Sequence, residues 1–310
     1  MKKVLIAAPV HRILTDWLTA NGYEYITNTS ITQAEAMMVV ADCTGIVTST
    51  RLLINKELLD AAPNLKWVGR MGSGMEIIDT IYAKAKGVTC FSSPEGNRNA
   101  VAEHALGSLL SLNKRIYKSF NEVKEGQWLR DENRGVELDG KTIGIIGFGN
   151  TGQAFAKKLL GFDVKILTYD KYVGDLKMSN TISCSNIDDI YKEADVVSFH
   201  VPLNNDTKHY FNAAFIEKME KPFVLLNTSR GEVVDTAALW QGLQSKKVSG
   251  ACIDVLEEEP LEKMGAETLR RVKEMAKMYN VIITPHIAGY SVEALYKMSK
   301  IVLSKIAICM

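Results

Sequence analysis

Three polar side chains that could move a proton and bind an anion follow three separate apolar runs of the chain. Arg230 lies in NTSRG, Glu259 closes the acidic run of IDVLEEEP, and His286 follows Pro285 in TPHIAG. Taken singly, Arg230 fits a surface ion pair, the run Glu257–Glu259 a solvated turn, and His286 a buried, hydrogen-bonded histidine. Each also stands at the end of an expected strand, where open α/β sheets bind their ligands. The shared position favours one common site.

A glycine-rich turn provides the second chemical element. Residues 141–170 read as a buried strand, the turn GFGNTG, a helix, a second strand and then Asp170. In this G-x-G-x-x-G pattern, Gly147 makes a sharp turn, Gly149 lets a pyrophosphate approach the backbone, and Gly152 lets the helix pack closely on the strand. Asp170 stands where a carboxylate accepts both ribose hydroxyls of NAD and repels the additional phosphate of NADP. The prediction is an NAD site with the phosphates at the helix N-terminus.

Beside a nicotinamide, the three polar groups fit the transfer of a hydride from a secondary alcohol. His286 would exchange the hydroxyl proton, a task for which an imidazole is best suited because it can gain and lose a proton near neutral pH. Glu259 would orient that ring and hold its proton in the reducing direction. Arg230 would bind a substrate carboxylate in bidentate fashion and polarise the adjacent carbonyl.

The composition excludes several other classes of function. The 310 residues are 46% hydrophobic and 24% charged, and 37 Lys and Arg nearly balance 36 Asp and Glu, so neither nucleic acid nor an anionic membrane is an expected partner. No apolar run approaches the roughly 20 residues needed to cross a bilayer. The cysteines are odd in number and form no C-x-x-C pair, which predicts free thiols in the cytoplasm and no metal site. They are Cys43, Cys90, Cys184, Cys252 and Cys309.

The order of apolar runs predicts an α/β protein. Helical runs, two of them closed by Gly22 and Gly87, alternate over residues 1–95 with strand-like runs at Val4–Ala8, Gly45–Thr48, Leu65–Val68 and Val88–Phe91. The alternation resumes after Asp170, with strands near Val196–His200, Phe223–Asn227, Gly250–Val255 and Val281–Thr284, as in parallel sheets with right-handed crossovers. Between them we expect a polar loop, Ser93–Asn99, a helix Ala100–Phe120 capped by Asn99, and a charged excursion, Asn121–Gly140. A last helix is expected over Ser291–Met310.

The sequence resembles the D-2-hydroxyacid dehydrogenases that use NAD, over almost its whole length. One departure is Glu76, which stands where the family motif GxGxDxID has an aspartate. The matching motifs are VGRMGSGMEIID (Val68–Asp79), GNRNAVAEHALG (Gly96–Gly107), GFGNTG with Asp170, HVPL (His200–Leu203), NTSRGEVVD (Asn227–Asp235), IDVLEEEP and TPHIAG.

The resemblance implies two doubly wound parallel-sheet domains. An NAD-binding Rossmann domain at 99–287 is inserted in a flavodoxin-like substrate domain made of 1–98 and 288–310. It further implies catalytic roles for Arg230, Glu259 and His286, and a homodimer formed through the excursion after Phe120. The other implied ligands are the amides of Ser73 and Gly74 for the substrate carboxylate, and Gly147, Gly149, Asn150, Thr151, Gly152, Asp170, His200, Pro202, Thr207, Thr228, Ser229 and Asp254 for NAD.

The substrate implied first is D-3-phosphoglycerate. The stretch GQWLRDENRGVELDGKTIG is most similar to the D-3-phosphoglycerate dehydrogenases of serine biosynthesis. There an arginine at the position of Arg130 reaches the substrate phosphate across the dimer, and one at the position of Arg70 is a second phosphate ligand. A third arginine of that site falls at Thr48, although Arg51 is close and could replace it.

Two alternatives remain open. Reduction of glyoxylate or hydroxypyruvate would use the same triad, with Arg70 and Arg130 as surface charges. A redox-sensing binding protein, like the transcriptional corepressors of this fold, would also keep the triad, although the chain lacks disordered flanks for recruiting partners. Because the chain stops at Met310, we expect no C-terminal regulatory domain and no serine feedback.

Overall fold

The computed structural model describes residues 2–172 and 182–308, and the chain divides into two units. The first unit comprises Met1–Ala100 and Gly289–Met310, and the second comprises Val101–Ala288. Cys309 and the end of the expected last helix lie outside the described residues. None of the helices in the described part of the chain is both long and apolar enough to cross a membrane.

The first unit is built on a five-stranded parallel sheet whose order is β2-β1-β3-β4-β5. This order is the flavodoxin-like one, as the resemblance implied. Its strands are β1 (Lys2–Ile6), β2 (Tyr23–Thr27), β3 (Cys43–Thr48), β4 (Trp67–Arg70) and β5 (Thr89–Phe91), and its helices are α1 (Arg12–Ala20), α2 (Gln33–Val39), α3 (Lys56–Ala61), α4 (Thr80–Ala85), α12 (Val292–Ile308) and the short η1 (Val40–Asp42).

Two glycines shape the core of this sheet. A Cβ at Gly45 would lie 2.1 Å from the Trp67 ring, and one at Gly69 would lie 2.6 Å from Val302. The buried Val302 and Ile306 therefore bring α12 against β4, which joins the end of the chain to its beginning. Burying side chains of this size contributes about 1.5–3 kcal/mol each.

The second unit holds a seven-stranded parallel sheet whose order is β12-β11-β10-β9-β6-β7-β8. The order reverses between β6 and β9, so the crevice at their carboxyl ends is the place where doubly wound sheets bind dinucleotides. The strands are β6 (Thr142–Ile146), β7 (Lys165–Tyr169), β8 (Ile182–Cys184), β9 (Val196–Phe199), β10 (Phe223–Asn227), β11 (Val248–Ile253) and β12 (Val281–Ile283).

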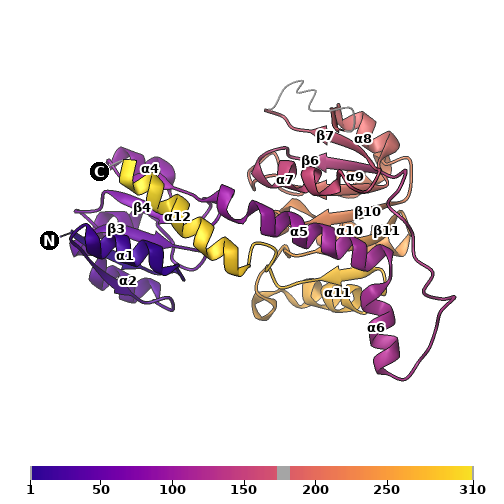
Figure 1. The fold of residues 1–310 in the computed structure, drawn as a ribbon, viewed down its shortest axis with the longest axis horizontal. Helices are drawn as coiled ribbons and strands as arrows, with labels where there is room; N and C mark the ends of the chain where they lie inside the picture. The colour runs from indigo at the N-terminus through magenta and orange to yellow at the C-terminus, as the bar shows by residue number, and fades with distance from the viewer. Residues whose placement is uncertain (1, 173–181, 309–310) are drawn as a thin grey trace. The chain divides into compact units, whose positions relative to one another are not determined.

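The helices of this unit cover the sheet, except for α6, which leads away from it (Figure 1) and buries none of its side chains. They are α5 (Pro94–Asn113), which begins in the first unit, α6 (Ile116–Lys124), α7 (Asn150–Leu159), α8 (Ile187–Glu193), α9 (Ala213–Lys218), α10 (Thr236–Gln244), α11 (Ala266–Ala276), and the short η2 (Gly231–Val233) and η3 (Leu261–Lys263). The expected fold class, α/β with two doubly wound parallel sheets, is confirmed.

The segment between the units differs from the expectation. The helix α5 begins at Pro94, so Asn99 lies inside the helix and does not cap it. Proline is favoured in the first helical turn, where its missing N–H leaves no bond unmade. The helix also ends early, because Arg115 adopts a left-handed conformation (φ 54°) and α6 starts anew after it.

Three elements were not expected from the sequence: β2, α2 and β8. The strand β2 lies at the edge of its sheet and has mostly exposed side chains, so it lacks the apolar run of the central strands. A signal for α2 was present, since Thr32 and Glu35 form a capping box at its start.

Candidate active site

The structure brings Glu259 and His286 together in the second unit. The Nδ1 atom of His286 lies 2.8 Å from Oε2 of Glu259, and the side chains are 42% and 34% exposed. The other carboxylate oxygen of Glu259 accepts a hydrogen bond from the amide of Leu256 at 2.7 Å. Because the carboxylate engages Nδ1, the imidazole keeps Nε2 for proton exchange with a substrate.

The Glu259 carboxylate is held in its charged form. Partial burial raises its pKa, but the hydrogen bond and charge of His286, the Leu256 amide and the charge of Arg230 together outweigh burial, so its pKa lies below the usual value. Glu259 is therefore ionised throughout the neutral range, where it can stabilise a protonated imidazole.

Arg230 follows β10 and is positioned by its own turn. The buried Asn227 side chain donates to the carbonyl of Arg230 at 2.9 Å and accepts from both the amide and the hydroxyl of Ser229. The half-buried Arg230 donates from Nη1 to the Ser229 carbonyl at 2.6 Å. The turn thus fixes the start of the arginine side chain at the carboxyl end of the sheet.

The loop that carries His286 is organised by Asp254, which is 2% exposed. The Asp254 carboxylate accepts hydrogen bonds from the amides of Ile287 (2.9 Å) and Ala288 (2.8 Å), and its carbonyl accepts from the amide of His286 (2.7 Å). These bonds hold His286 in the left-handed region (φ 55°), which residues with a side chain seldom adopt. The resemblance assigned Asp254 to NAD, and here its side chain is engaged by the His286 loop.

The run Glu257–Glu259 is not a solvated turn. Glu257 lies 2.6 Å from Nε2 of His209 and accepts from the amide of Thr236 at 2.9 Å. Glu258 accepts from the amide of Gly265 and from the hydroxyl of Thr268. Each glutamate of the run therefore has its own partners.

The glycine turn after β6 has the geometry of a phosphate-binding turn. Gly147 has a φ of 91°, and a Cβ there would lie 2.5 Å from the carbonyl oxygen of His200. A Cβ at Gly152 would lie 2.2 Å from the carbonyl oxygen of Gly147, so α7 could not pack closely with any larger residue. At Gly149, by contrast, no atom of the described residues beyond its chain neighbours and its own helix backbone lies within 4 Å of the Cβ position. The protein leaves this space open, as the approach of a pyrophosphate requires.

Asp170 is bonded to the turn itself. Its Oδ2 accepts from the amide of Phe148 at 2.7 Å, and its Oδ1 accepts from the amide of Tyr172 at 2.9 Å. The carboxylate expected at the ribose therefore also fixes the glycine turn, a connection that the spacing of the motif does not reveal.

Two buried polar atoms near the reversal of strand order have no hydrogen-bond partner among the described residues: Nδ1 of His200 and Oγ1 of Thr228. They follow the adjacent strands β9 and β10. His200 bonds Ser198 through Nε2 at 2.8 Å, and burial lowers its pKa to about 3, so its ring is neutral at physiological pH. Because buried polar atoms are almost always bonded, these two atoms fit a bound ligand with polar groups, as NAD would be.

The remaining residues expected at NAD lie in the same unit. Thr207 donates to the carbonyl of Pro202 at 2.6 Å and accepts from the amide of Asn204 at 2.8 Å, so its hydroxyl shapes its own loop. Asn150 and Thr151 form the first turn of α7.

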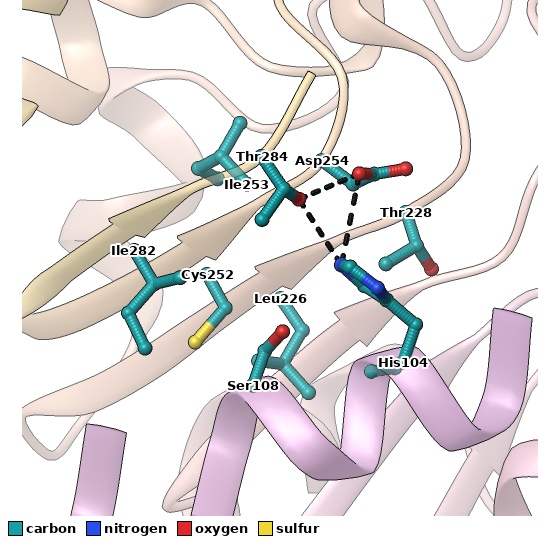
Figure 2. A pocket seen from close by; sticks show the side chains of 10 residues that line it. His104, Ser108, Leu226, Thr228, Cys252, Ile253, Asp254, Ile282 and Thr284 are labelled. Atoms are coloured by element: carbon teal, nitrogen blue, oxygen red, sulfur yellow. Dashed lines mark hydrogen bonds and ion pairs between the residues drawn. The ribbon is translucent and has the colours of Figure 1, made fainter. Parts of the chain in front are cut away.

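A pocket lies between α5 and the carboxyl ends of β10, β11 and β12 (Figure 2). His104 reaches into it from α5, close to Thr284 and Asp254. Neither His104 nor Thr284 was expected at a functional site. A signal was available for His104, which lies in the GNRNAVAEHALG motif within the expected helix.

The residues expected at the substrate belong to the first unit, except for Arg130, which belongs to the second. Arg70 is 7% exposed and donates from Nη1 to the carbonyl of Met71 at 2.7 Å, so the alternative that it is a surface charge is wrong. Its guanidinium lies against Gly72, where a Cβ would be 1.7 Å from Nη1. Ser73 donates to Asn97 at 3.2 Å, and Gly74 is half-buried beside it. Arg51 is exposed in the first unit, and Arg130 is exposed in the second.

The cysteines and acidic residues form no metal site in the part of the chain that the structure describes, where no group of three or more His, Cys, Asp and Glu could hold an ion. Cys43, Cys90, Cys184 and Cys252 are free. Burial raises the pKa of Cys90 to about 11 and that of Cys252 further, so both thiols stay protonated and unreactive.

Known proteins resemble the chain over most of its length. Over 94% of its residues it is 33% identical to the hydroxypyruvate reductase of Thermotoga maritima, and it covers 93% of that protein. It is also 33% identical, over 94% of its residues, to the D-3-phosphoglycerate dehydrogenase of Archaeoglobus fulgidus, of which it covers 54%. The chain thus spans only about half of the second relative.

The structure of D-lactate dehydrogenase from Aquifex aeolicus complexed with NAD and lactic acid matches with a TM-score of 0.83 at 30% identity, over 99% of this chain and 95% of that one. Residues 106–288 match the model of the NAD-binding domain of the D-isomer specific 2-hydroxyacid dehydrogenases. With this domain over more than half of its length, the chain belongs to the family of D-isomer specific, NAD-dependent 2-hydroxyacid dehydrogenases.

Proposed function

We propose that this protein transfers a hydride reversibly between NAD and a small D-2-hydroxy acid. The observation that carries the proposal is the pairing of His286 with an ionised Glu259 (2.8 Å) near the charge of Arg230, at the carboxyl edge of an NAD-binding sheet. An imidazole, a carboxylate and a guanidinium together supply what oxidation of an alcohol beside a carboxylate needs.

Each side chain has a separate role in the reducing direction. Arg230 binds the substrate carboxylate and polarises the neighbouring carbonyl. Protonated His286 gives its Nε2 proton to the carbonyl oxygen as the hydride arrives at carbon, and Glu259 stabilises the imidazolium before that step. NADH, when bound, supplies the hydride. In the oxidising direction the same Nε2 takes the hydroxyl proton.

The preference for NAD over NADP is assigned to Asp170, next to the open face of the glycine turn. An Asp170→Ala variant should lose the repulsion of the 2′-phosphate and weaken the preference, about tenfold in the ratio of kcat/KM with NADH to that with NADPH. Glu193→Ala, which removes a surface carboxylate paired with Lys165, is the matched control. An unaltered ratio in Asp170→Ala would mean that the ribose is bound elsewhere.

D-3-phosphoglycerate, and with it serine biosynthesis, is the first candidate substrate. Exposed Arg130 and Arg51 support it, because several arginines can bind a phosphate in bidentate fashion. The similarity to a D-3-phosphoglycerate dehydrogenase agrees with this choice.

A second candidate substrate, hydroxypyruvate or glyoxylate, is favoured by the burial of Arg70. Its guanidinium is buried and hydrogen-bonded to its own loop, and Thr48, at the place of another arginine, is also buried. One expected phosphate ligand, Arg70, is thus engaged by its own loop, whereas Arg51 and Arg130 are exposed. The similarity to a hydroxypyruvate reductase over nearly its full length agrees with this alternative.

The experiment is NADH oxidation by the purified protein with phosphohydroxypyruvate, hydroxypyruvate and glyoxylate side by side, repeated with Arg130→Ala. Arg134→Ala is the matched control, because Arg134 is exposed in the same segment and paired with Asp131 at 3.1 Å. A preference for the phosphorylated acid that Arg130→Ala alone abolishes supports the first candidate. Equal rates with the unphosphorylated acids support the second. No turnover of any 2-oxo acid, together with NADH-dependent capture of a protein, would favour a redox sensor.

A homodimer is the expected assembly. Ile116, Phe120 and Trp128, in α6 and the segment after it, are 56%, 64% and 78% exposed, and apolar residues gathered in this way mark interfaces. Sedimentation should give a dimer for the protein and a monomer for Phe120→Asp. A monomeric wild type would contradict the assembly and the role of Arg130 across it. The cytoplasmic location stays a prediction from the free thiols.

A further inference from the structure

One histidine outside the proposed triad is connected to the residue that holds the His286 loop. His104, on α5, is 21% exposed, and its Nε2 lies 3.0 Å from Oγ1 of Thr284 and 3.6 Å from Oδ1 of Asp254 (Figure 2). Nothing in the hydride transfer described above uses this side chain.

The direction of the hydrogen bonds follows from the number of protons. The Thr284 hydroxyl has one hydrogen, and it donates to Oδ1 of Asp254 at 2.6 Å. The hydroxyl oxygen can therefore only accept from His104, so His104 carries a hydrogen on Nε2. The bonds form one chain, from His104 to Thr284 and from Thr284 to Asp254.

Asp254 in turn binds the backbone of the loop that carries His286. Its buried carboxylate accepts the amides of Ile287 and Ala288, and its carbonyl accepts the amide of His286. A buried carboxylate must have all of its hydrogen bonds satisfied, so a change on the His104 side shifts the carboxylate against the loop.

We propose that His104 is a positioning residue for His286, acting through Thr284 and Asp254; this inference rests on the proposed function. The hydrogen on Nε2 orients the Thr284 hydroxyl toward Asp254, and Asp254 holds His286 in its left-handed conformation (φ 55°). A side chain without that hydrogen lets the carboxylate and the loop relax, which displaces the imidazole from the reacting carbonyl.

The test compares His104→Leu, which lacks the donor, with His104→Gln, whose amide can reproduce it. Ser108→Ala is the matched control, because Ser108 lines the same pocket one helical turn away. In NADH oxidation, His104→Leu should lower kcat about tenfold to hundredfold, as expected for a small misplacement of a catalytic group. His104→Gln should recover most of the loss. The dissociation constant of NADH and the KM of the acid should change less than about twofold in both variants, since the loop acts on the chemical step.

If His104 only stabilised the fold, the kcat values of the two variants would differ from this expectation. If His104→Leu and His104→Gln lose kcat equally, or if His104→Leu keeps the kcat of the wild type, the inference is wrong. If the wild type itself turns over no 2-oxo acid, it is the proposed function that fails.

A second measurement keeps the inference testable if His104→Leu does not fold. Long-range proton–nitrogen NMR correlation on the wild-type protein should show His104 with its hydrogen on Nε2. A hydrogen on Nδ1 alone would remove the donor to Thr284 and overturn the proposal.

Discussion

The second unit contains two histidine–glutamate pairs that are alike in distance and exposure, although His286 uses Nδ1 and His209 uses Nε2. His286 with Glu259 and His209 with Glu257 have nitrogen–oxygen distances of 2.8 and 2.6 Å, and both histidines are left-handed, with φ of 55° and 49°. The two glutamates are two residues apart, and the histidines are exposed to a similar degree, 42% and 39%. Distance and exposure alone would not tell which pair is catalytic.

The difference lies in what surrounds each pair. The second oxygen of Glu257 accepts the amide of Thr236 at the start of α10, and the amide of His209 donates to the carbonyl of Glu232, so this pair ties loops together. Glu259 instead lies within the field of Arg230, and His286 is fixed by the buried Asp254. A short contact between imidazole and carboxylate becomes a candidate for catalysis only where a substrate-binding cation and the carboxyl ends of the strands meet it.

The largest expected effect separates the two histidines. His286→Ala should lower kcat about 10²- to 10⁴-fold, because general acid–base catalysis is lost, while the dissociation constant of NADH stays within about twofold. His209→Ala, measured in the same assay, should keep most of the activity. Turnover that survives in His286→Ala would remove this residue from the mechanism.

A smaller effect separates the two glutamates. Because the Glu259 charge stabilises the protonated imidazole that gives up its proton, Glu259→Gln should lower kcat/KM for reduction about tenfold or more at neutral pH. Glu257→Gln, measured in the same assay, should keep most of the activity. An equal loss in both variants would show that the pairs are not distinct.

The stability of the fold should depend on Glu257, the glutamate whose replacement leaves the activity intact. Glu257→Ala removes the acceptor of the Thr236 amide and the partner of His209, which costs about 1–2 kcal/mol of the free energy of unfolding. Scanning calorimetry should show a Tm lower by about 2–4 °C per kcal/mol, with kcat unchanged. Lost activity without lost stability would reverse the assignment of the two pairs.

The smallest expected effect is the loss, at acid pH, of the stabilisation that the Glu259 charge contributes. Since the pKa of Glu259 is lower in the folded than in the unfolded chain, its stabilisation is complete above the unfolded value and is lost as the pH falls through the folded one. The difference in Tm between the wild type and Glu259→Gln should therefore be present at pH 7 and shrink below about pH 4.5. A difference independent of pH would mean that the carboxylate charge contributes nothing.

Much of the fold follows from local pattern. The apolar runs place the central strands, and Gly22 and Gly87 have φ of 74° and 76°, as expected where α1 and α4 end. The edge strands β2 and β8 and the start of α5 do not follow from this pattern. The side chains of β2 are mostly exposed, β8 has only three residues, and Pro94 in the first turn of α5 is typical of a loop as well as of a helix start.

The sequence by itself determined the chemistry that is possible here. In a parallel sheet the carboxyl ends of neighbouring strands share one edge, so the sequence alone predicts Arg230, Glu259 and His286 near the NAD-binding turn. Their types limited the reaction to proton exchange beside a bound carboxylate, and the catalytic roles stay predictions for the variants above to test.

Only the tertiary structure decided which of these side chains have partners and which are buried. It paired Glu257 with His209, enclosed Arg70 against Gly72, and connected His104 to Asp254 over a separation of 150 residues. The physical reason is that desolvation and hydrogen bonding depend on all elements packed around a group, and most of those elements lie far away in the sequence.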